Sequence, residues 1–146
     1  IRERMNLADF QPGQPKPVAP VVQRLVAPNA SPMTGPGTNC YLIGDPVWAV
    51  IDPGPDDDAH LAAIQAAAPG LSTVFVTHTH RDHSPLARRL AAMTGAQIVG
   101  RAAPQDGRQD TGFVPHRQPE PDEIFRQRGD ALQAIHTPGH ASNHVC

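Results

Sequence analysis

Cysteine is scarce in this sequence, and its two copies lie far apart. Cys40 and Cys146 form neither a CxxC pair nor any comparable spacing. The sequence therefore predicts neither a disulfide framework nor a zinc site built from thiolates. This cysteine usage is typical of a reducing compartment, and we expect a cytoplasmic protein.

Long apolar runs are missing as well. Nowhere do about 18 apolar residues follow one another, which is the length that a membrane-spanning helix requires. The first ten residues are charged and contain no apolar stretch behind a basic segment. We expect neither a membrane partner nor an export signal.

Neither positive charge nor aromatic side chains are abundant. The formal net charge is −2, and aromatic residues make up 4% of the chain. Binding a polyanion relies on Lys and Arg at each phosphate, and single-strand binders add aromatic platforms for the bases. A nucleic-acid partner is therefore disfavoured, although a local basic patch would still allow one, and a small-molecule substrate is expected.

What the sequence does contain is enough for one domain. Its 146 residues are 39% hydrophobic, which supports a modest core, and its 17 prolines and 12 glycines indicate many loops. Residues 1–20, of which 11–20 are rich in Pro and Gln, are predicted to form an extended N-terminal arm, and residues 21–146 the domain itself. Strands are predicted at 21–27, 39–43, 47–51, 74–76, 96–99 and 131–135.

Two helices are predicted from their caps. The Ala-rich run 59–68 follows three aspartates and stops at Pro69 and Gly70. The second helix begins with Ser84 as N-cap and Pro85 as its first residue, and Gly95 ends it.

A cluster of histidines and an aspartate, with the pattern HxHxDH, fills residues 78–83. Side chains alternate in an extended segment, so His78 and His80 present two imidazoles to one metal ion. Asp82 and His83 lie in the following turn and can be directed at a second ion nearby. Imidazole and carboxylate ligands suit zinc. A lone histidine is more often structural than a ligand, but three histidines and an aspartate at this spacing favour a metal site.

The remaining histidines lie outside the HxHxDH cluster in sequence. Pro138 and Gly139 predict a tight turn that would bring His140 towards the HxHxDH loop. Three ligands and a water complete a tetrahedral zinc, so His136 and His144 are interpreted as scaffold or substrate-side residues. Nothing around His60 or His116 suggests a ligand.

Three motifs together resemble the metallo-β-lactamase superfamily. HxHxDH follows a strand, the 39–51 strand pair leads into Asp52, Pro53 and Gly54, and residues 137–140 read TPGH. The resemblance covers about residues 21–146 and implies an α+β fold, the αββα sandwich of that superfamily. Within it, residues 29–44 are similar to a group of small single-domain hydrolases that includes β-lactamase-like endoribonucleases.

The resemblance also implies roles for individual residues. His78, His80 and His140 would hold a first zinc ion, and Asp82 and His83 a second. Asp82 would be catalytic, because it would orient the nucleophile. Asp52 would support the metal loop by hydrogen bonding, although a simple turn residue is an equal alternative.

The implied activity is zinc-dependent hydrolysis, in which a metal-bound hydroxide attacks an ester, thioester, lactone or similar carbonyl substrate. A metal-dependent endoribonuclease and a non-catalytic metal-binding fragment are the alternatives. The di-iron branch of the superfamily is disfavoured, because it replaces the second histidine of the motif with Glu and this chain has His80.

The end of the sequence departs from the superfamily pattern. The superfamily places a bridging aspartate and a final histidine in the second half of its fold, whereas this sequence stops at Cys146, where residues 143–146 look like the start of a strand. We therefore expect the N-terminal part of a sandwich, incomplete at its C-terminus. Such a part would leave an apolar sheet face that the second half, or another copy in a homo-oligomer, would cover.

Overall fold

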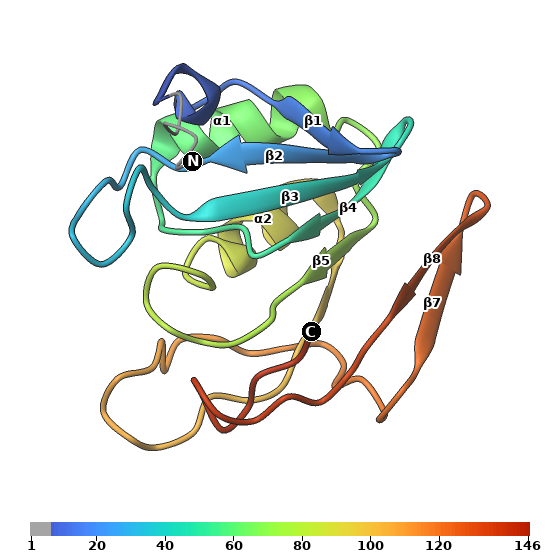
Figure 1. Ribbon diagram of the computed structural model, residues 1–146. Helices are drawn as coiled ribbons and strands as arrows, with labels where there is room; N and C mark the ends of the chain where they lie inside the picture. The colour runs from blue at the N-terminus through green and yellow to red at the C-terminus, as the bar shows by residue number, and fades with distance from the viewer. Residues whose placement is uncertain (1–6) are drawn as a thin grey trace, which may run out of the picture.

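The centre of the computed structural model, which describes residues 7–146, is a six-stranded mixed sheet (Figure 1). The strands lie side by side in chain order: β1 (Lys16–Ala19), β2 (Val22–Val26), β3 (Asn39–Gly44), β4 (Val47–Ile51), β5 (Thr73–Phe75) and β6 (Gln97–Val99). Neighbouring strands are antiparallel from β1 to β4 and parallel from β4 to β6. A 3-10 turn, η1 (Leu7–Phe10), precedes the sheet.

The sheet starts earlier than the sequence indicated. Lys16 lies opposite Arg24 in an antiparallel pair, so β1 falls inside the segment 1–20 that we predicted to be an extended arm. Residues 16–19 are extended, but they form the edge strand of the sheet. A short Pro-containing strand carries little local signal, because the hydrogen bonds that define it come from β2. The first six residues of the predicted arm lie outside the described residues.

The predicted β3–β4 hairpin and both helices are present. Tyr41 pairs with Ile51 across the hairpin. The first helix, α1 (Asp58–Ala67), begins after Asp57, whose carboxylate accepts a hydrogen bond from the His60 N–H in an N-cap. The second, α2 (Ala87–Thr94), ends at Gly95 in the left-handed conformation, as its sequence predicted.

The predicted N-cap of α2 is wrong. Ser84 is fully buried, and its hydroxyl donates to the Asp110 carboxylate 2.8 Å away instead of capping the helix. The helix begins at Ala87, two residues after Pro85. The long segment between β6 and the last strands thus provides an acceptor for Ser84 that only the tertiary fold brings close.

The last part of the chain forms a separate antiparallel pair, β7 (Ile124–Gln127) and β8 (Asp130–Gln133). β8 lies close to the predicted strand 131–135, whereas β7 was not predicted. The expected strand at 143–146 is reduced to one bridge between His136 and Val145. The main chain there forms hydrogen bonds with two different segments. Val145 N–H donates to the Thr77 carbonyl, and Cys146 exchanges hydrogen bonds with Ile135.

The two faces of the sheet pack against different elements. Figure 1 shows both helices on one side of the sheet and the β7–β8 pair on the other. On the helix side, Leu61, Ile64 and Leu90 join the sheet residues in the main buried cluster. On the opposite side, Trp48 donates to Asp130 in β8, and Phe75 contacts Phe125 edge to face. No helix among residues 7–146 is long and apolar enough to cross a membrane.

His60, a buried residue of the core, makes the stability of the folded protein depend on pH. Its side chain is 1% exposed, and neither ring nitrogen forms a hydrogen bond of ordinary geometry within residues 7–146. Burial lowers the pKa of His60, a shift that the carbonyl of Pro53 opposes. Its contribution to stability is therefore fully present above the unfolded pKa of about 6.5 and is lost as the pH falls through the lower folded value.

We expect His60→Leu to flatten this pH dependence. Urea unfolding of the metal-free protein at pH 7.5 and 5.5 would measure the free energy of unfolding at both values. The wild type should lose more stability than the variant on acidification. At pH 5.5 the exposed imidazole of the unfolded wild type binds a proton that the buried imidazole of the folded protein binds less readily, whereas leucine binds none. Equal losses in the two proteins would contradict this account of His60.

Candidate metal centre

The candidate centre lies where β5 runs into the HxHxDH loop, beside the end of β4. The two strands are parallel, with Ile51 opposite Phe75. Asp52 continues this pairing, since its N–H donates to the Phe75 carbonyl 2.8 Å away. The carboxyl ends of parallel strands meet at one edge of a sheet, which is why Asp52 and the loop 76–86 share that edge.

Three histidines from two distant segments meet at this edge. His80 Nδ1 lies 3.0 Å from His140 Nε2. The His78 ring centroid is 4.7 Å from that of His80 and 5.0 Å from that of His140. One nitrogen from each of the three rings lies within 4.8 Å of the other two, a spacing that could hold one metal ion. The structure thus brings together the three residues that were predicted to hold a first metal.

The residues that follow the TPGH segment form hydrogen bonds with the HxHxDH loop. Val145 N–H donates to the Thr77 carbonyl at 2.7 Å, and the Asn143 side-chain amide donates to the Thr79 hydroxyl at 3.0 Å. Asn143 and Thr79 are both buried. These hydrogen bonds hold the turn that carries His140 against the loop that carries His78 and His80.

Asp52 connects two of the histidines through hydrogen bonds. One of its oxygens accepts from Thr77 N–H at 2.7 Å, and the other accepts from the Thr77 hydroxyl at 2.6 Å and from His83 Nδ1 at 2.9 Å. Because the hydroxyl gives its only proton to Asp52, it accepts from His78 Nδ1, 2.9 Å away. Asp52 therefore fixes the tautomers of the neutral His78 and His83 rings, directly or through Thr77, so that Nε2 is the nitrogen of each neutral ring that can bind a metal.

His78 is the histidine whose environment fits a metal ligand best. Its side chain is buried, and its Nε2 has no hydrogen-bond partner within residues 7–146. Burial and the neighbouring His83 lower the pKa of His78 to about 4. The ring is therefore neutral near pH 7, which is the form that binds metals. A buried acceptor without a partner is costly unless a cation or donor reaches it.

The other imidazoles respond to burial and charge in opposite directions. Burial and the neighbouring His140 lower the pKa of His80. Burial acts in the same direction on His83, but the hydrogen bond and charge of Asp52 outweigh it and raise the pKa of His83 above its ordinary value. His83 is thus the member of the cluster that carries a proton most readily when no metal competes for it.

Asp82 lies at the edge of the cluster. One of its oxygens is 3.2 Å from His83 Nε2 and accepts a hydrogen bond from the Thr38 hydroxyl at 3.1 Å. The second group of residues that could hold an ion is Asp52, His78 and His83, and it does not include Asp82. Both oxygens of Asp52 are already committed to hydrogen bonds, so Asp52 is better suited to supporting His83 than to binding a metal directly.

The remaining histidines separate into one neighbour of the cluster and three that lie elsewhere. The His144 ring stacks on His78 with centroids 4.9 Å apart and accepts or donates at the Thr137 hydroxyl, 2.9 Å away. His136 contacts Arg101 and His116 contacts the main chain of β6, while His60 belongs to α1 and is buried in the core. His144 thus lies beside the cluster, and its role as a scaffold or substrate-side residue stays a prediction.

Sequence reasoning missed the hydroxyl and amide groups that support the cluster. Thr38, Thr77 and Asn143 each hydrogen-bond to the HxHxDH loop or to Asp52. Thr77 stands directly before the motif, and that position could have drawn attention to it. Thr38 and Asn143 carry no such local signal, because their partners lie 44 and 64 residues away.

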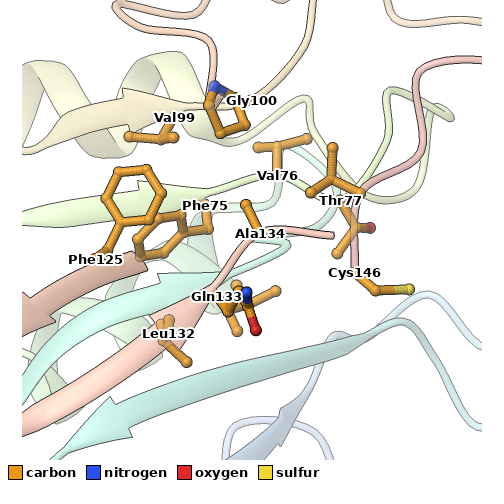
Figure 2. A pocket seen from close by; sticks show the side chains of 13 residues that line it. Phe75, Val76, Thr77, Val99, Gly100, Phe125, Leu132, Gln133, Ala134 and Cys146 are labelled. Atoms are coloured by element: carbon orange, nitrogen blue, oxygen red, sulfur yellow. The ribbon is translucent and has the colours of Figure 1, made fainter. Parts of the chain in front are cut away.

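An apolar cavity of about 100 Å³ lies near this edge but is not part of the centre. Figure 2 shows Phe75, Phe125 and Leu132 lining it between β5 and the β7–β8 pair. Thr77 borders the cavity, whereas none of the clustered histidines lines it.

Comparisons with known proteins agree with this geometry. The sequence profile of the metallo-beta-lactamase superfamily matches residues 33–146. An atrochrysone carboxyl ACP thioesterase of Paecilomyces divaricatus is 31% identical over 136 residues, which are 88% of this chain and 41% of that protein. A hydroxyacylglutathione hydrolase of Albidiferax ferrireducens is 35% identical over 104 residues, which are 66% of this chain and 35% of that protein. The chain therefore spans less than half the length of these curated relatives.

Solved structures show the same fold. A metallo-beta-lactamase of Cronobacter sakazakii superposes with a TM-score of 0.73 at 20% identity, covering 90% of this chain and 58% of that one. The subclass B3 enzyme of Bradyrhizobium japonicum gives 0.72 at 16% identity, covering 93% of this chain and 56% of that one. The predicted metallo-β-lactamase fold is confirmed. On the strength of its sequence profile, this chain belongs to the metallo-beta-lactamase superfamily.

Proposed function

We propose that the full-length protein is a zinc-dependent hydrolase of a small ester, thioester or lactone. The observation that carries this proposal is the convergence of His78, His80 and His140 within 4.8 Å, with Nε2 of His78 buried and without a partner in residues 7–146. Three imidazoles at an open sheet edge are the donor set of a catalytic zinc site. A zinc ion held there supplies an activated water nucleophile and polarises the carbonyl that is attacked.

The chain's own residues would prepare this site in three ways. Asp52 and Thr77 orient His78, and Asp52 orients His83, so that both rings offer Nε2. Asp82 would bind a second ion together with His83 and accept a proton from the attacking water. The two loops that carry these groups are held together by the buried Asn143 and Thr79, which keeps the donors in register.

A carbonyl substrate is favoured over RNA by the available charge and by the relatives. The net charge of −2 and 4% aromatic content provide no general field or stacking surface for a polyanion. One relative is named a thioesterase and another a hydroxyacylglutathione hydrolase. The thioester is therefore our preferred substrate class. The cytoplasmic location inferred from the cysteine usage remains a prediction.

The proposal is tested by a direct comparison of substrates. Zinc-loaded full-length protein would be assayed on an acyl thioester by thiol release, on a chromogenic ester and on single-stranded RNA. We expect turnover of the thioester or ester to exceed RNA cleavage. Asp82→Ala should lower kcat at least about 100-fold, as expected when a proton-accepting group is lost.

Glu120→Ala provides the control, because Glu120 is an exposed acid with no contact to the histidine cluster. It should retain wild-type kcat. RNA cleavage that disappears in Asp82→Ala, together with negligible thioesterase and esterase activity, would replace the carbonyl substrate by RNA. Full activity after zinc removal by a chelator would contradict metal dependence.

A further inference from the structure

The strongest unexplained feature near the centre is the way in which Asp82 is held from outside its own loop. Among residues 7–146, its carboxylate has two close polar partners, His83 and Thr38. Under the proposed function His83 Nε2 would bind a metal ion and would no longer be a hydrogen-bond partner of Asp82. Thr38 would then be the remaining anchor of this carboxylate.

Thr38 is itself fixed on several sides. Its side chain is 4% exposed, and it precedes β3 at the end of the loop 28–37. Its N–H donates to Asn29 Oδ1 at 2.8 Å, and its carbonyl accepts from Ala27 N–H at 2.9 Å. Its hydroxyl also receives a hydrogen bond from Asn29 Nδ2 at 2.9 Å. Thr38 therefore has little freedom to choose another partner.

These hydrogen bonds have a single consistent direction. The oxygen of the Asn29 amide is occupied by Thr38 N–H, so its NH₂ group is the one that faces the Thr38 hydroxyl. An NH₂ group can only donate, and a hydroxyl has one proton. The Thr38 proton is consequently directed to Asp82 Oδ2, 3.1 Å away. This leaves Asp82 Oδ1 as the oxygen that is not held by Thr38.

We propose that Asn29 and Thr38 form an ordered donor chain that positions the Asp82 carboxylate for the second metal ion. Both are positioning residues that act through Asp82, and the inference rests on the proposed function. The chain would fix Asp82 Oδ2, the oxygen that also lies 3.2 Å from His83 Nε2, and so hold the carboxylate beside the second histidine that would bind the ion. Hydrogen bonds of this kind orient ligating carboxylates in metal sites, and their loss typically weakens metal binding about 10–100-fold.

A simpler role for both residues is to close the loop 28–37, and the experiment must separate the two roles. Thr38→Val keeps the shape but removes the hydroxyl, whereas Thr38→Ser keeps the hydroxyl. Asn29→Asp replaces the donating NH₂ by an acceptor, so the Thr38 proton would turn away from Asp82. Thr34→Val is the matched control, because the Thr34 hydroxyl donates to the Asn29 carbonyl at 2.6 Å in the same loop without touching Asp82.

Full-length metal-free protein would be titrated with cobalt(II), and each equivalent followed by its visible absorption, with Tm measured in parallel. We expect Thr38→Val and Asn29→Asp to bind the second equivalent about 10–100-fold more weakly and the first with less than about threefold change. Thr38→Ser should restore the second affinity. Thr34→Val should lower Tm while both affinities stay at the wild-type level.

The outcomes are distinguishable. Wild-type affinity for the second equivalent in Thr38→Val or Asn29→Asp, or an equal loss in Thr34→Val, would overturn the donor chain. If Thr38→Val fails to fold, Asn29→Asp decides the question. A wild-type protein that binds one equivalent would overturn this inference but leave the first metal site standing. A wild-type protein that binds no cobalt would overturn the proposed function as well.

Discussion

Replacing His78 and His140 together by alanine is expected to abolish tight binding of the first metal ion. Their rings, 5.0 Å apart between centroids, supply two of the three nitrogens that lie within 4.8 Å of one another. His80 alone would remain, and one imidazole does not hold zinc against buffer. The loss should exceed the about 10–100-fold that removal of a supporting residue costs. Elemental analysis of the purified protein and cobalt(II) absorption would measure it.

The control for this pair is His116→Ala. His116 is an exposed histidine whose Nδ1 accepts a hydrogen bond from Ile98 N–H, away from the cluster. It should retain the metal content of the wild type. If the double variant also retains that content, the first metal site is not formed by these residues.

Asp52→Asn is expected to destabilise the protein and to weaken metal binding together. Asp52 is 6% exposed and accepts three hydrogen bonds, from Thr77 N–H, the Thr77 hydroxyl and His83 Nδ1. An amide can replace one acceptor, but its NH₂ group would then face donors. Leaving buried donors without an acceptor costs about 1–3 kcal/mol each. We expect the free energy of unfolding of the metal-free protein to fall by about 2 kcal/mol.

Asparagine is chosen because it should not strain the backbone at position 52. Asp52 has a φ of 54°, in the left-handed region, where Asn is tolerated far better than Ala. Urea unfolding and cobalt(II) titration would give the two effects, and metal affinity should drop about 10–100-fold.

Asp57→Asn removes the same charge from the N-cap of α1, where Asn serves nearly as well as Asp. Wild-type stability and metal affinity in both variants would show that Asp52 is only a turn residue. A loss of stability in Asp52→Asn with unchanged metal affinity would confine Asp52 to a structural role.

Local sequence was sufficient for the elements that are stabilised by their own neighbours along the chain. The β3–β4 hairpin and α1 carry their signals within a few residues, in the turn at 44–46 and in the Asp57 N-cap. The HxHxDH motif likewise placed His78 and His80 on one side of an extended segment, because side chains alternate there. These predictions rest on hydrogen bonds and periodicities of short range.

Only the tertiary structure decided which distant groups meet. β1 exists because β2 offers hydrogen bonds to it, and Ser84 binds Asp110 instead of capping α2 because the later segment folds over it. Thr38 reaches Asp82 across 44 residues of sequence. Such contacts depend on how strands are ordered in the sheet and on where loops cross its edge. A sequence window of ten or so residues contains neither fact, so the candidate ligands were predictable from the motif, whereas the groups that orient them were not.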